Sequence, residues 1–227
     1  AGKCRGYSAG VVNHPDNMYP KGNAFRDGKP QPNDDLEMTI IEYNKAAPEP
    51  ERKSVYKPAG KNLLTNGDFE EGTPSETVKE IPGWTMWESA KTLHWFGAYG
   101  RDKSQAARII GGSINGTKID GGFVQKVSGL TSGKSYRLSG WVNMAPQVDS
   151  KFMSRVGHDP TGQTTDPKAS TIVWTGTGRS SNRFEQVAID DIQPKSDAVS
   201  VWLRGANKNN ERVTFTVDFD DFVLEAK

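Results

Sequence analysis

Short segments in which apolar and polar residues alternate recur along residues 106–224. Alternation places successive side chains on opposite faces of a strand. The segments come about every ten residues and are separated by turn formers such as residues 131–134, a spacing typical of a β-sandwich. The pattern predicts strands at 106–110, 122–127, 135–143, 151–156, 170–174, 183–189, 198–204 and 213–224.

The first sixty residues follow a different pattern. Proline and turn-forming residues interrupt any helical period, so we expect an extended or irregular arm over residues 1–61 and one domain over residues 62–227. Residues 36–43 alternate well enough for one strand, with Leu36, Met38 and Ile40 on one side. This strand has no partner in its own arm, so it pairs either with the same sandwich or with a neighbouring molecule.

Two terminal motifs carry a resemblance to a known family. The run NLLTNGDFEEG at 62–72, followed by Pro82, Gly83 and Trp84, reads as an opening strand and first loop. The run VDFDDFVL at 217–224 looks like the closing strand, which pairs beside the opening one. Residues 156–162 and 171–174 look like a segment that recurs in secreted glycan-associated proteins. Together they resemble the galactose-binding-like β-jelly-roll superfamily, in particular carbohydrate-binding module families four, nine and twenty-two. The resemblance implies an all-β jelly-roll sandwich that is secreted or at the cell surface.

Alternation in two of the predicted strands separates a core face from a polar face. Tyr136, Leu138, Gly140 and Val142 belong to the core, as do Val199, Val201 and Leu203. The opposite faces carry an aromatic ring beside a guanidinium, which suits a sugar because pyranose rings offer apolar faces and a rim of hydroxyl groups. We therefore predict a ligand groove on one sheet face that includes Trp141, Arg137, Trp202 and Arg204. The alternative is that these rings pack under a loop or under the arm.

The connection after the opening motif is rich in aromatic residues. Trp84 looks like the residue that closes one end of the sandwich in the resembling modules, and Trp174 shares a face with Ile172, so we expect both to be structural. Trp87, Trp95 and Tyr99 are candidates for a ligand platform, with core packing as the open alternative.

Acidic residues at the two ends of the domain suggest a metal site. The resembling modules hold a structural Ca²⁺ with the glutamate that follows the opening phenylalanine and an aspartate of the last strand, which implies Glu70 and Asp220 here. Asp68 and Asp221 are possible additional ligands. Carboxylate and carbonyl oxygens suit Ca²⁺, although the alternative of solvated acidic side chains stays open.

The composition excludes some classes of function. The chain has 227 residues, and 29 Lys and Arg against 28 Asp and Glu leave a net charge of +1, so no field steers it to nucleic acid. No apolar run is long enough to span a membrane. The single Cys4 forms no internal disulfide. The histidines, His14, His94 and His158, are widely separated and no nucleophile motif is present, so we expect no enzyme.

Three hypotheses remain open at this stage. The first is a non-catalytic extracellular module that holds a polysaccharide by aromatic stacking. The second is a structural subunit of an extracellular filament or sheath, in which the arm reaches into a further copy of the chain. A jelly-roll hydrolase is the third, without a recognisable active-site motif. Because this fold hosts many functions, the choice of sugar binding depends on the site itself.

Overall fold

A computed structural model describes residues 55–76, 80–90, 92–111, 118–145, 152–175, 183–207 and 214–227, together with two short N-terminal strands. The chain divides into two compact units, Ala1–Ser54 and Val55–Lys227. Within the first unit, β2 (Phe25–Arg26) pairs antiparallel with β3 (Lys29–Pro30). The predicted strand at 36–43 lies outside the described residues.

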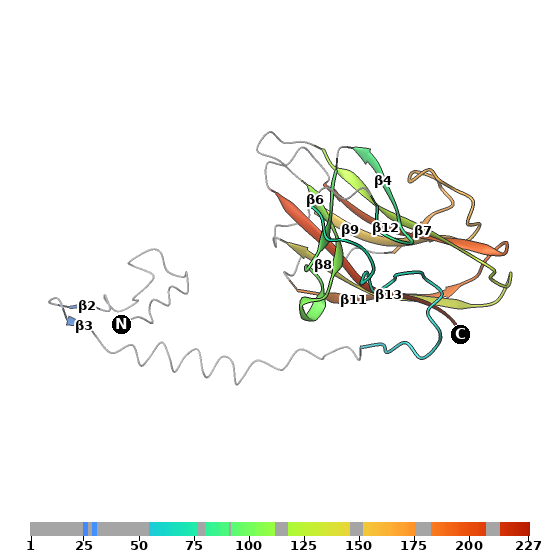
Figure 1. The fold of residues 1–227 in the computed structure, drawn as a ribbon, viewed down its shortest axis with the longest axis horizontal. Helices are drawn as coiled ribbons and strands as arrows, with labels where there is room; N and C mark the ends of the chain where they lie inside the picture. The colour runs from blue at the N-terminus through green and yellow to red at the C-terminus, as the bar shows by residue number, and fades with distance from the viewer. Residues whose placement is uncertain are drawn as a thin grey trace. The chain divides into compact units, whose positions relative to one another are not determined.

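The second unit is a β-sandwich, as predicted. Its strands, drawn in Figure 1, form two five-stranded sheets. The first sheet has the order β10-β9-β12-β7-β4, and the second sheet has the order β11-β8-β13-β6-β5. In chain order the elements are β4 (Thr85–Ala90), β5 (Leu93–Gly97), the 3₁₀ turn η1 (Arg101–Lys103), β6 (Ala106–Gly111), β7 (Asp120–Ser128), β8 (Tyr136–Ala145), β9 (Phe152–Asp159), β10 (Val173–Trp174), β11 (Glu185–Ile192), β12 (Ala198–Asn207) and β13 (Phe215–Ala226).

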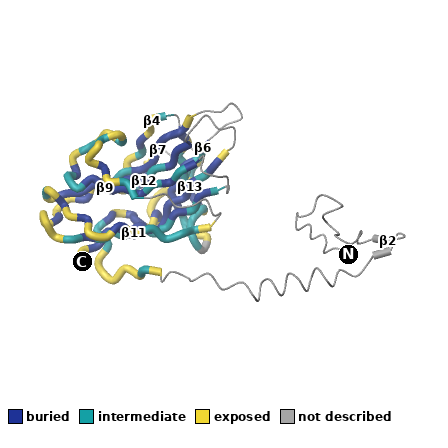
Figure 2. The backbone as a smooth tube through the Cα atoms, turned by 180° about the vertical axis from the view of Figure 1, so that it is seen from behind, coloured by how far each residue is buried: buried dark blue, intermediate teal, exposed yellow. Residues whose placement is uncertain are grey.

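The core lies between the two sheets, where the inward side chains of β8, β12 and β13 meet. Tyr136, Leu138 and Val142 are buried there, and Val199, Val201 and Leu203 have no exposed surface, as their alternation predicts. Figure 2 shows the same division along the backbone, with buried segments in the strands and exposed segments mainly in the connecting loops. Because alternation fixes which side chains point inward, the remaining side chains of each strand form two outer faces.

Each of the predicted strands over 106–224 overlaps a strand in the structure, but the start of the domain differs. The segment 62–72, predicted as an opening strand and first loop, contains a turn and no strand, because Asn66 (φ 48°) and Phe69 (φ 56°) adopt left-handed backbone that a strand cannot accommodate. It lies beside the closing strand as predicted, and Leu63 N donates to Leu224 O at 2.8 Å. The side chain of Asn66 holds this turn by donating to Glu71 O at 2.9 Å and Pro82 O at 3.1 Å. The aromatic-rich connection after it, read as a loop, contains β4 and β5.

Trp84 has the predicted structural role. Its ring is 4% exposed and stacks on Phe69 with 5.2 Å between ring centroids. The indole nitrogen donates to Asn66 O at 3.0 Å, so the turn and the core are fixed together.

Among the described residues, no helix has the length and apolar character that a membrane crossing needs.

Residues 55–61, which the sequence assigns to the arm, lie against the second sheet. Glu225 of β13 accepts hydrogen bonds from Ala59 N at 3.0 Å, Gly60 N at 2.5 Å and the Tyr56 hydroxyl. Gln186 of β11 pairs with both backbone groups of Tyr56, each at 2.7 Å. The compact unit therefore begins at Val55 rather than at residue 62.

Candidate functional site

The predicted ligand residues do not share one face of the sandwich. Trp141 and Arg137 lie on β8 in the second sheet, and Trp202 and Arg204 lie on β12 in the first sheet. Both pairs point away from the core, so they are on opposite outer faces of the molecule. The prediction of one groove containing all four residues is therefore wrong. The sequence pattern gives the side of a strand to which a residue points but does not give the sheet that the strand joins.

On the second sheet, guanidinium groups lie over aromatic rings, including that of the predicted ligand residue Trp141. Arg101 lies 3.8 Å over the Trp141 ring and pairs with Asp221 at 2.7 Å. Arg137 lies 4.0 Å over the ring of Tyr56 and pairs with Asp190. A cation over an aromatic face stabilises the fold and occupies the surface on which a sugar would stack.

Trp95 and Tyr99 also belong to the second sheet side of the molecule. Trp95 lies on β5, and its ring centroid is 6.2 Å from that of Tyr99. Arg108 lies 3.7 Å over the Tyr99 ring and makes two hydrogen bonds to Asp218, at 2.5 and 3.0 Å. Burial raises the pKa of Asp218, and the hydrogen bonds and charge of Arg108 oppose that shift. Tyr99 is thus part of a structural network rather than a free platform.

The first sheet has a tryptophan cluster on its outer face. Trp202, at the centre of β12, has no exposed surface, and Trp87 is 9% exposed, with their ring centroids 5.8 Å apart. Ile172 covers them and completes the cluster. The Trp202 indole nitrogen donates to Ser200 Oγ at 2.9 Å. Trp202 therefore has the role that the alternative assigned to it, a ring packed under a loop, and presents no face to a ligand in this conformation.

Two glycines shape the surface beside this cluster. Gly122 of β7 pairs with Trp87, and Gly157 of β9 pairs with Trp174. A Cβ at Gly122 would come within 3.0 Å of the Trp87 ring, and one at Gly157 within 2.7 Å of the Trp174 ring. Because these glycines have no side chain, both rings lie close against neighbouring strands. Trp174, predicted to be structural, is only half-buried.

Polar groups stand next to the half-buried Trp174. Arg204 of β12 makes two hydrogen bonds to Asp120 of β7, both of 2.7 Å, and its guanidinium carbon is 5.5 Å from the centroid of the Trp174 ring. Ser89 Oγ donates to Asp120 at 2.7 Å. The side chains of Arg204 and Asp120 are 21% and 10% exposed. A carboxylate and a guanidinium fixed in one plane can hydrogen-bond neighbouring hydroxyl groups of a sugar.

These residues form the candidate face, which we define as Trp87, Ser89, Asp120, Arg155, Trp174 and Arg204 on the outer side of the first sheet. One row of paired residues crosses four adjacent strands of this sheet: Trp87, Gly122, Arg204 and Arg155. Because neighbouring strands are ~4.8 Å apart, the row is about 14 Å wide. The sequence analysis selected Trp87 and Arg204 and missed the others. The predicted strand began at residue 122, whereas β7 begins at Asp120. Only a strand that begins there would have placed Asp120 on the outer face as a candidate ligand residue.

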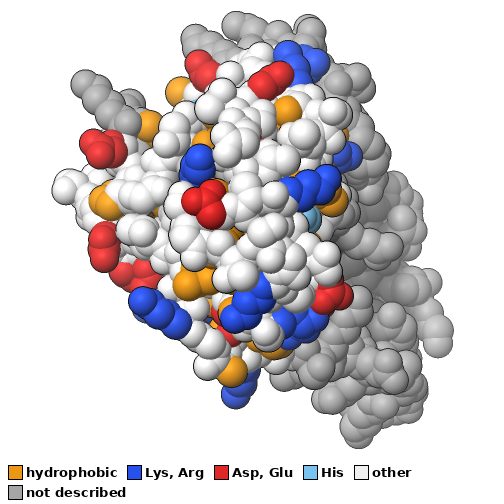
Figure 3. All heavy atoms as spheres, turned by 90° about the vertical axis from the view of Figure 1, so that its right-hand side faces the viewer, with side chains coloured by type: hydrophobic (Ala, Val, Ile, Leu, Met, Phe, Trp, Pro, Cys, Tyr) orange, Lys and Arg blue, Asp and Glu red, His pale blue; other side chains and the backbone are white. Residues whose placement is uncertain are grey.

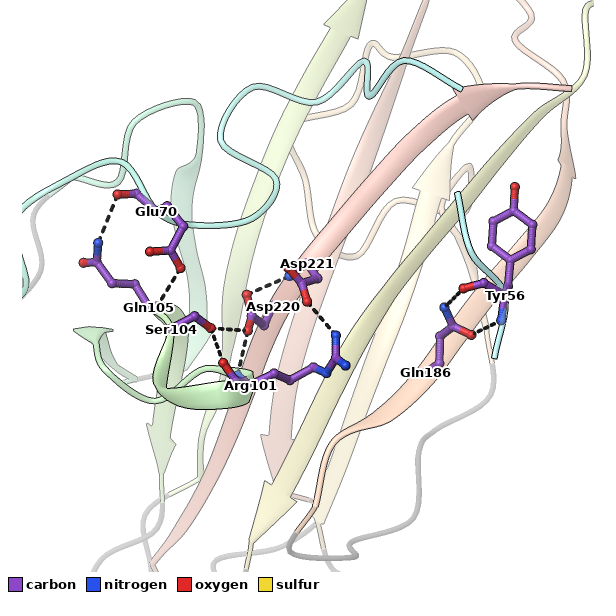
Figure 4. A network of polar contacts seen from close by, with 8 residues as sticks. All are labelled: Tyr56, Glu70, Arg101, Ser104, Gln105, Gln186, Asp220 and Asp221. Atoms are coloured by element: carbon purple, nitrogen blue, oxygen red, sulfur yellow. Dashed lines mark hydrogen bonds and ion pairs between the residues drawn. The ribbon is translucent and has the colours of Figure 1, made fainter. Parts of the chain in front are cut away.

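The predicted metal ligands divide into two pairs. Glu70 and Asp220 both hold the turn at residues 100–105, as Figure 4 shows: Arg101 N donates to Asp220 at 2.8 Å and Gln105 N donates to Glu70 at 2.9 Å. Asp221 instead pairs with Arg101, and the exposed Asp68 accepts a long 3.5 Å bond from Glu70 N. Asp221 and Asp68 are therefore poorly placed as ligands.

The chemistry around Asp220 partly fits a hard cation. Its carboxylate is fully buried, and burial raises its pKa to about 6, with hydrogen bonds from Arg101 and Ser104 opposing and the charge of Asp221 assisting. Gln105 Oε1 is buried without a hydrogen-bond partner. In the described part of the chain, however, no three His, Cys, Asp or Glu side chains gather. Backbone carbonyls and water would have to complete the six to eight ligands of Ca²⁺, and calcium binding stays a proposal.

The two described histidines are remote from the candidate face. His94 of β5 packs on Phe123 with 5.3 Å between ring centroids, and His158 of β9 pairs with Val201, whose side chain is in the core. Burial lowers the pKa of both imidazoles. Since neutral, inward-facing imidazoles cannot reach a ligand on the outer side of the sheet, neither histidine belongs to the site.

The face of the molecule drawn in Figure 3 shows no patch of a single charge sign. In Figure 3, which looks at one end of the sandwich, acidic and basic side chains are interspersed and hydrophobic ones are scattered. This agrees with the net charge of +1. Any ligand selectivity must therefore come from local groups rather than from long-range steering.

Comparison with solved structures supports the fold. No protein-family model matches the chain, and no curated protein matches its sequence. The enzymatically active domain of tailspike protein 4 of bacteriophage CBA120 is similar over 73% of this chain, with 12% identity and a TM-score of 0.51, and the match spans only 21% of the tailspike chain. A family 61 carbohydrate-binding module in complex with β-1,4-galactotriose is similar over 74% of this chain and 99% of its own, with 14% identity and a TM-score of 0.51.

At these identities the likeness is one of fold. The prediction of a β-sandwich jelly roll like that of carbohydrate-binding modules is confirmed at that level. The fold alone does not give the ligand, the cellular location or whether the protein is catalytic, because one fold hosts many functions.

Proposed function

We propose that the sandwich is a non-catalytic, extracellular carbohydrate-binding module that holds a polysaccharide on the candidate face. The observation that carries the proposal is the fixed Arg204–Asp120 pair beside the half-buried Trp174. Trp174 offers a ring for stacking, and the ion pair offers a donor and an acceptor for hydroxyl groups. A module of the same fold in complex with a galactotriose supports this choice of ligand class.

The candidate face has the composition of a binding surface rather than of a hydrolytic site. A glycosidase needs two carboxyl groups on either side of the scissile bond. Among the described residues of this face, Asp120 stands with Arg204 and Ser89 instead of facing a second carboxyl group. The alternative function, a filament subunit assembled through residues 36–43, depends on residues outside those that the structure describes, and no observation favours it.

Binding to a panel of soluble polysaccharides, measured by affinity gel electrophoresis, tests the proposal. Trp174→Ala should weaken binding roughly threefold to tenfold, because aromatic stacking contributes about 0.5–1.5 kcal/mol beyond area burial. The melting temperature should fall only modestly, because Trp174 is on the short edge strand β10 and packs on the tryptophan cluster while only half-buried.

Trp141→Ala is the matched control. It removes a half-buried tryptophan from the outer face of the second sheet, where Arg101 covers the ring. Polysaccharide retention that is lost in Trp141→Ala and kept in Trp174→Ala would move the site to the second sheet. A wild-type protein that binds no polysaccharide in the panel would overturn the proposed function.

A further inference from the structure

Arg155 is the part of the candidate face that the binding of neutral hydroxyl groups does not explain. It lies on β9, directly paired with Arg204 of β12, so the two guanidinium side chains start from neighbouring positions on the same outer face. Arg204 has Asp120 as its partner. Within the part of the chain that the structure describes, Arg155 makes no ion pair, and its Nε is buried without a hydrogen-bond acceptor.

The local charge balance of the candidate face is therefore positive. Two guanidinium groups are set against one carboxylate, Asp120. A second acid on the outer side of this sheet, Asp159 of β9, lies four residues from Arg155. Its carboxylate accepts hydrogen bonds from the backbone N–H groups of Thr161 and Thr164, at 3.0 and 3.1 Å. An unpaired arginine beside another arginine costs free energy unless an anion neutralises it.

The unpartnered buried atoms on this face are also of one kind. Arg155 Nε and Trp87 Nε1 are both donors, and both lie in the row that crosses four strands. A ligand that satisfies them must present acceptors. An ionised carboxylate has only acceptors, and it matches the planar fork of a guanidinium group.

We propose that the polysaccharide held on the candidate face is acidic, and that the carboxylate of a uronic acid residue binds Arg155. This inference rests on the proposed function and adds the charge of the ligand to it. Trp174 is on β10 next to β9, so a sugar ring stacked on the indole can direct a carboxylate substituent to Arg155. Arg204 is held by Asp120, which leaves Arg155 as the group that selects for charge.

A set of three polysaccharides tests the selectivity with the full chain by isothermal titration calorimetry. The probes are polygalacturonate, the same polymer with its carboxyl groups methyl-esterified, and neutral β-1,4-galactan. The wild type should bind polygalacturonate at least about tenfold tighter than the ester at low salt, because the ester removes a charge-assisted hydrogen bond. This preference should shrink as salt is raised, since an exposed ion pair is screened.

Arg155→Gln should lose the preference and bind the free acid and the ester with equal affinity. Lys126→Gln is the matched control, because Lys126 lies on the outer face of the same sheet, four residues along β7 from Gly122. This control should keep the preference. Arg155→Lys, which retains the charge without the planar fork, should keep part of it, and it serves if Arg155→Gln does not fold.

The outcomes separate this inference from the function on which it rests. Equal binding of the acid and the ester by the wild type, or a preference that survives in Arg155→Gln, overturns the acidic ligand and leaves carbohydrate binding in place. A preference that Lys126→Gln also loses shows general charge attraction and overturns the role of Arg155. If the wild type binds none of the three polymers, both proposals are overturned: that this face binds a polysaccharide and that the polysaccharide is acidic.

Discussion

Two tryptophans on the outer side of the first sheet have different roles because of what lies over them. Trp202 is at the centre of β12, under Ile172, and has no exposed surface. Trp174 is on the edge strand β10 and keeps part of its ring accessible. At the scale of single residues, burial therefore distinguishes a stabilising aromatic ring from one that can contact a ligand.

Trp202→Ala should destabilise the sandwich by about 3–5 kcal/mol, because it removes a fully buried indole and leaves a cavity. The melting temperature, measured by scanning calorimetry, should fall by roughly 6–20 °C. Binding per folded molecule should change less than in Trp174→Ala. A variant that melts like the wild type and loses polysaccharide binding would instead show that the Ile172 cover opens for the ligand.

The raised pKa of Asp220 makes stability depend on pH. Between the ordinary carboxyl pKa of 3.8 and about 6, the folded state retains a proton that the unfolded state has released. The free energy of unfolding from this group therefore decreases as pH rises through that window. Since asparagine does not titrate, the melting temperature of Asp220→Asn relative to wild type, in chelator, should rise by several degrees between pH 4 and 7. A constant difference would contradict the assigned pKa.

At the scale of elements, residues 55–60 are fastened along the second sheet by two side chains. Glu225 of β13 accepts the N–H groups of Ala59 and Gly60. Gln186 of β11 pairs with the backbone of Tyr56, as Figure 4 shows. Burial opposes ionisation of Glu225, but hydrogen bonds from Tyr56, Gly60 and Ala59 and the charge of Arg137 outweigh it and lower the pKa. The carboxylate therefore acts as the anchor of this segment at neutral pH.

Glu225→Gln should loosen that segment without unfolding the sandwich. Hydrogen bonds to a charged acceptor contribute about 1.5–3 kcal/mol, so amide hydrogen exchange at Ala59 and Gly60 should accelerate roughly tenfold or more. The comparison is Glu185→Gln on β11, which removes only an exposed contact to Arg183 at 3.7 Å. Equal exchange in both variants would mean that Gln186 alone holds the segment.

At the scale of the whole molecule, the core belongs to one of the two compact units. Both five-stranded sheets and the core cluster of the described residues lie in Val55–Lys227. Removing residues 1–54 should therefore leave the melting temperature and polysaccharide affinity nearly unchanged, and light scattering should give a monomer before and after truncation. If the full chain forms polymers and the truncated chain does not, the filament-subunit alternative replaces the proposed function.

Calcium provides a second test at this scale. If Glu70 and Asp220 hold Ca²⁺ in the folded state only, adding the ion at about a hundred times its dissociation constant stabilises the protein by about 2.7 kcal/mol. The melting temperature should then rise by roughly 5–10 °C above its value in chelator, and Glu70→Gln should reduce this rise. A melting temperature that is the same with the ion and with chelator would show that hydrogen bonds from Arg101 N and Ser104 hold the Asp220 carboxyl group without a metal ion.

Alternation in the sequence was enough to determine the fold class, most strands and the inward side chains of β8 and β12. This is because the two-residue period of a strand is a local property. The structural role of Trp84, which is confirmed, came instead from the resemblance of the opening motif to known modules. The opening strand predicted within residues 62–72 is not formed, because hydrogen bonds from the Asn66 side chain to Glu71 O and Pro82 O hold a turn there.

Only the tertiary structure decided which residues share a face. Trp141 and Trp202 follow the same alternation, but β8 pairs with β11 and β13 while β12 pairs with β7 and β9. Strand pairing joins residues that are far apart in the chain, such as Arg204 with Asp120 and Arg155, and no local pattern encodes it. The cover of Trp202 by Ile172 and of Trp141 by Arg101 is likewise non-local. Periodicity thus determined the orientation of each side chain, and sheet topology determined its neighbours.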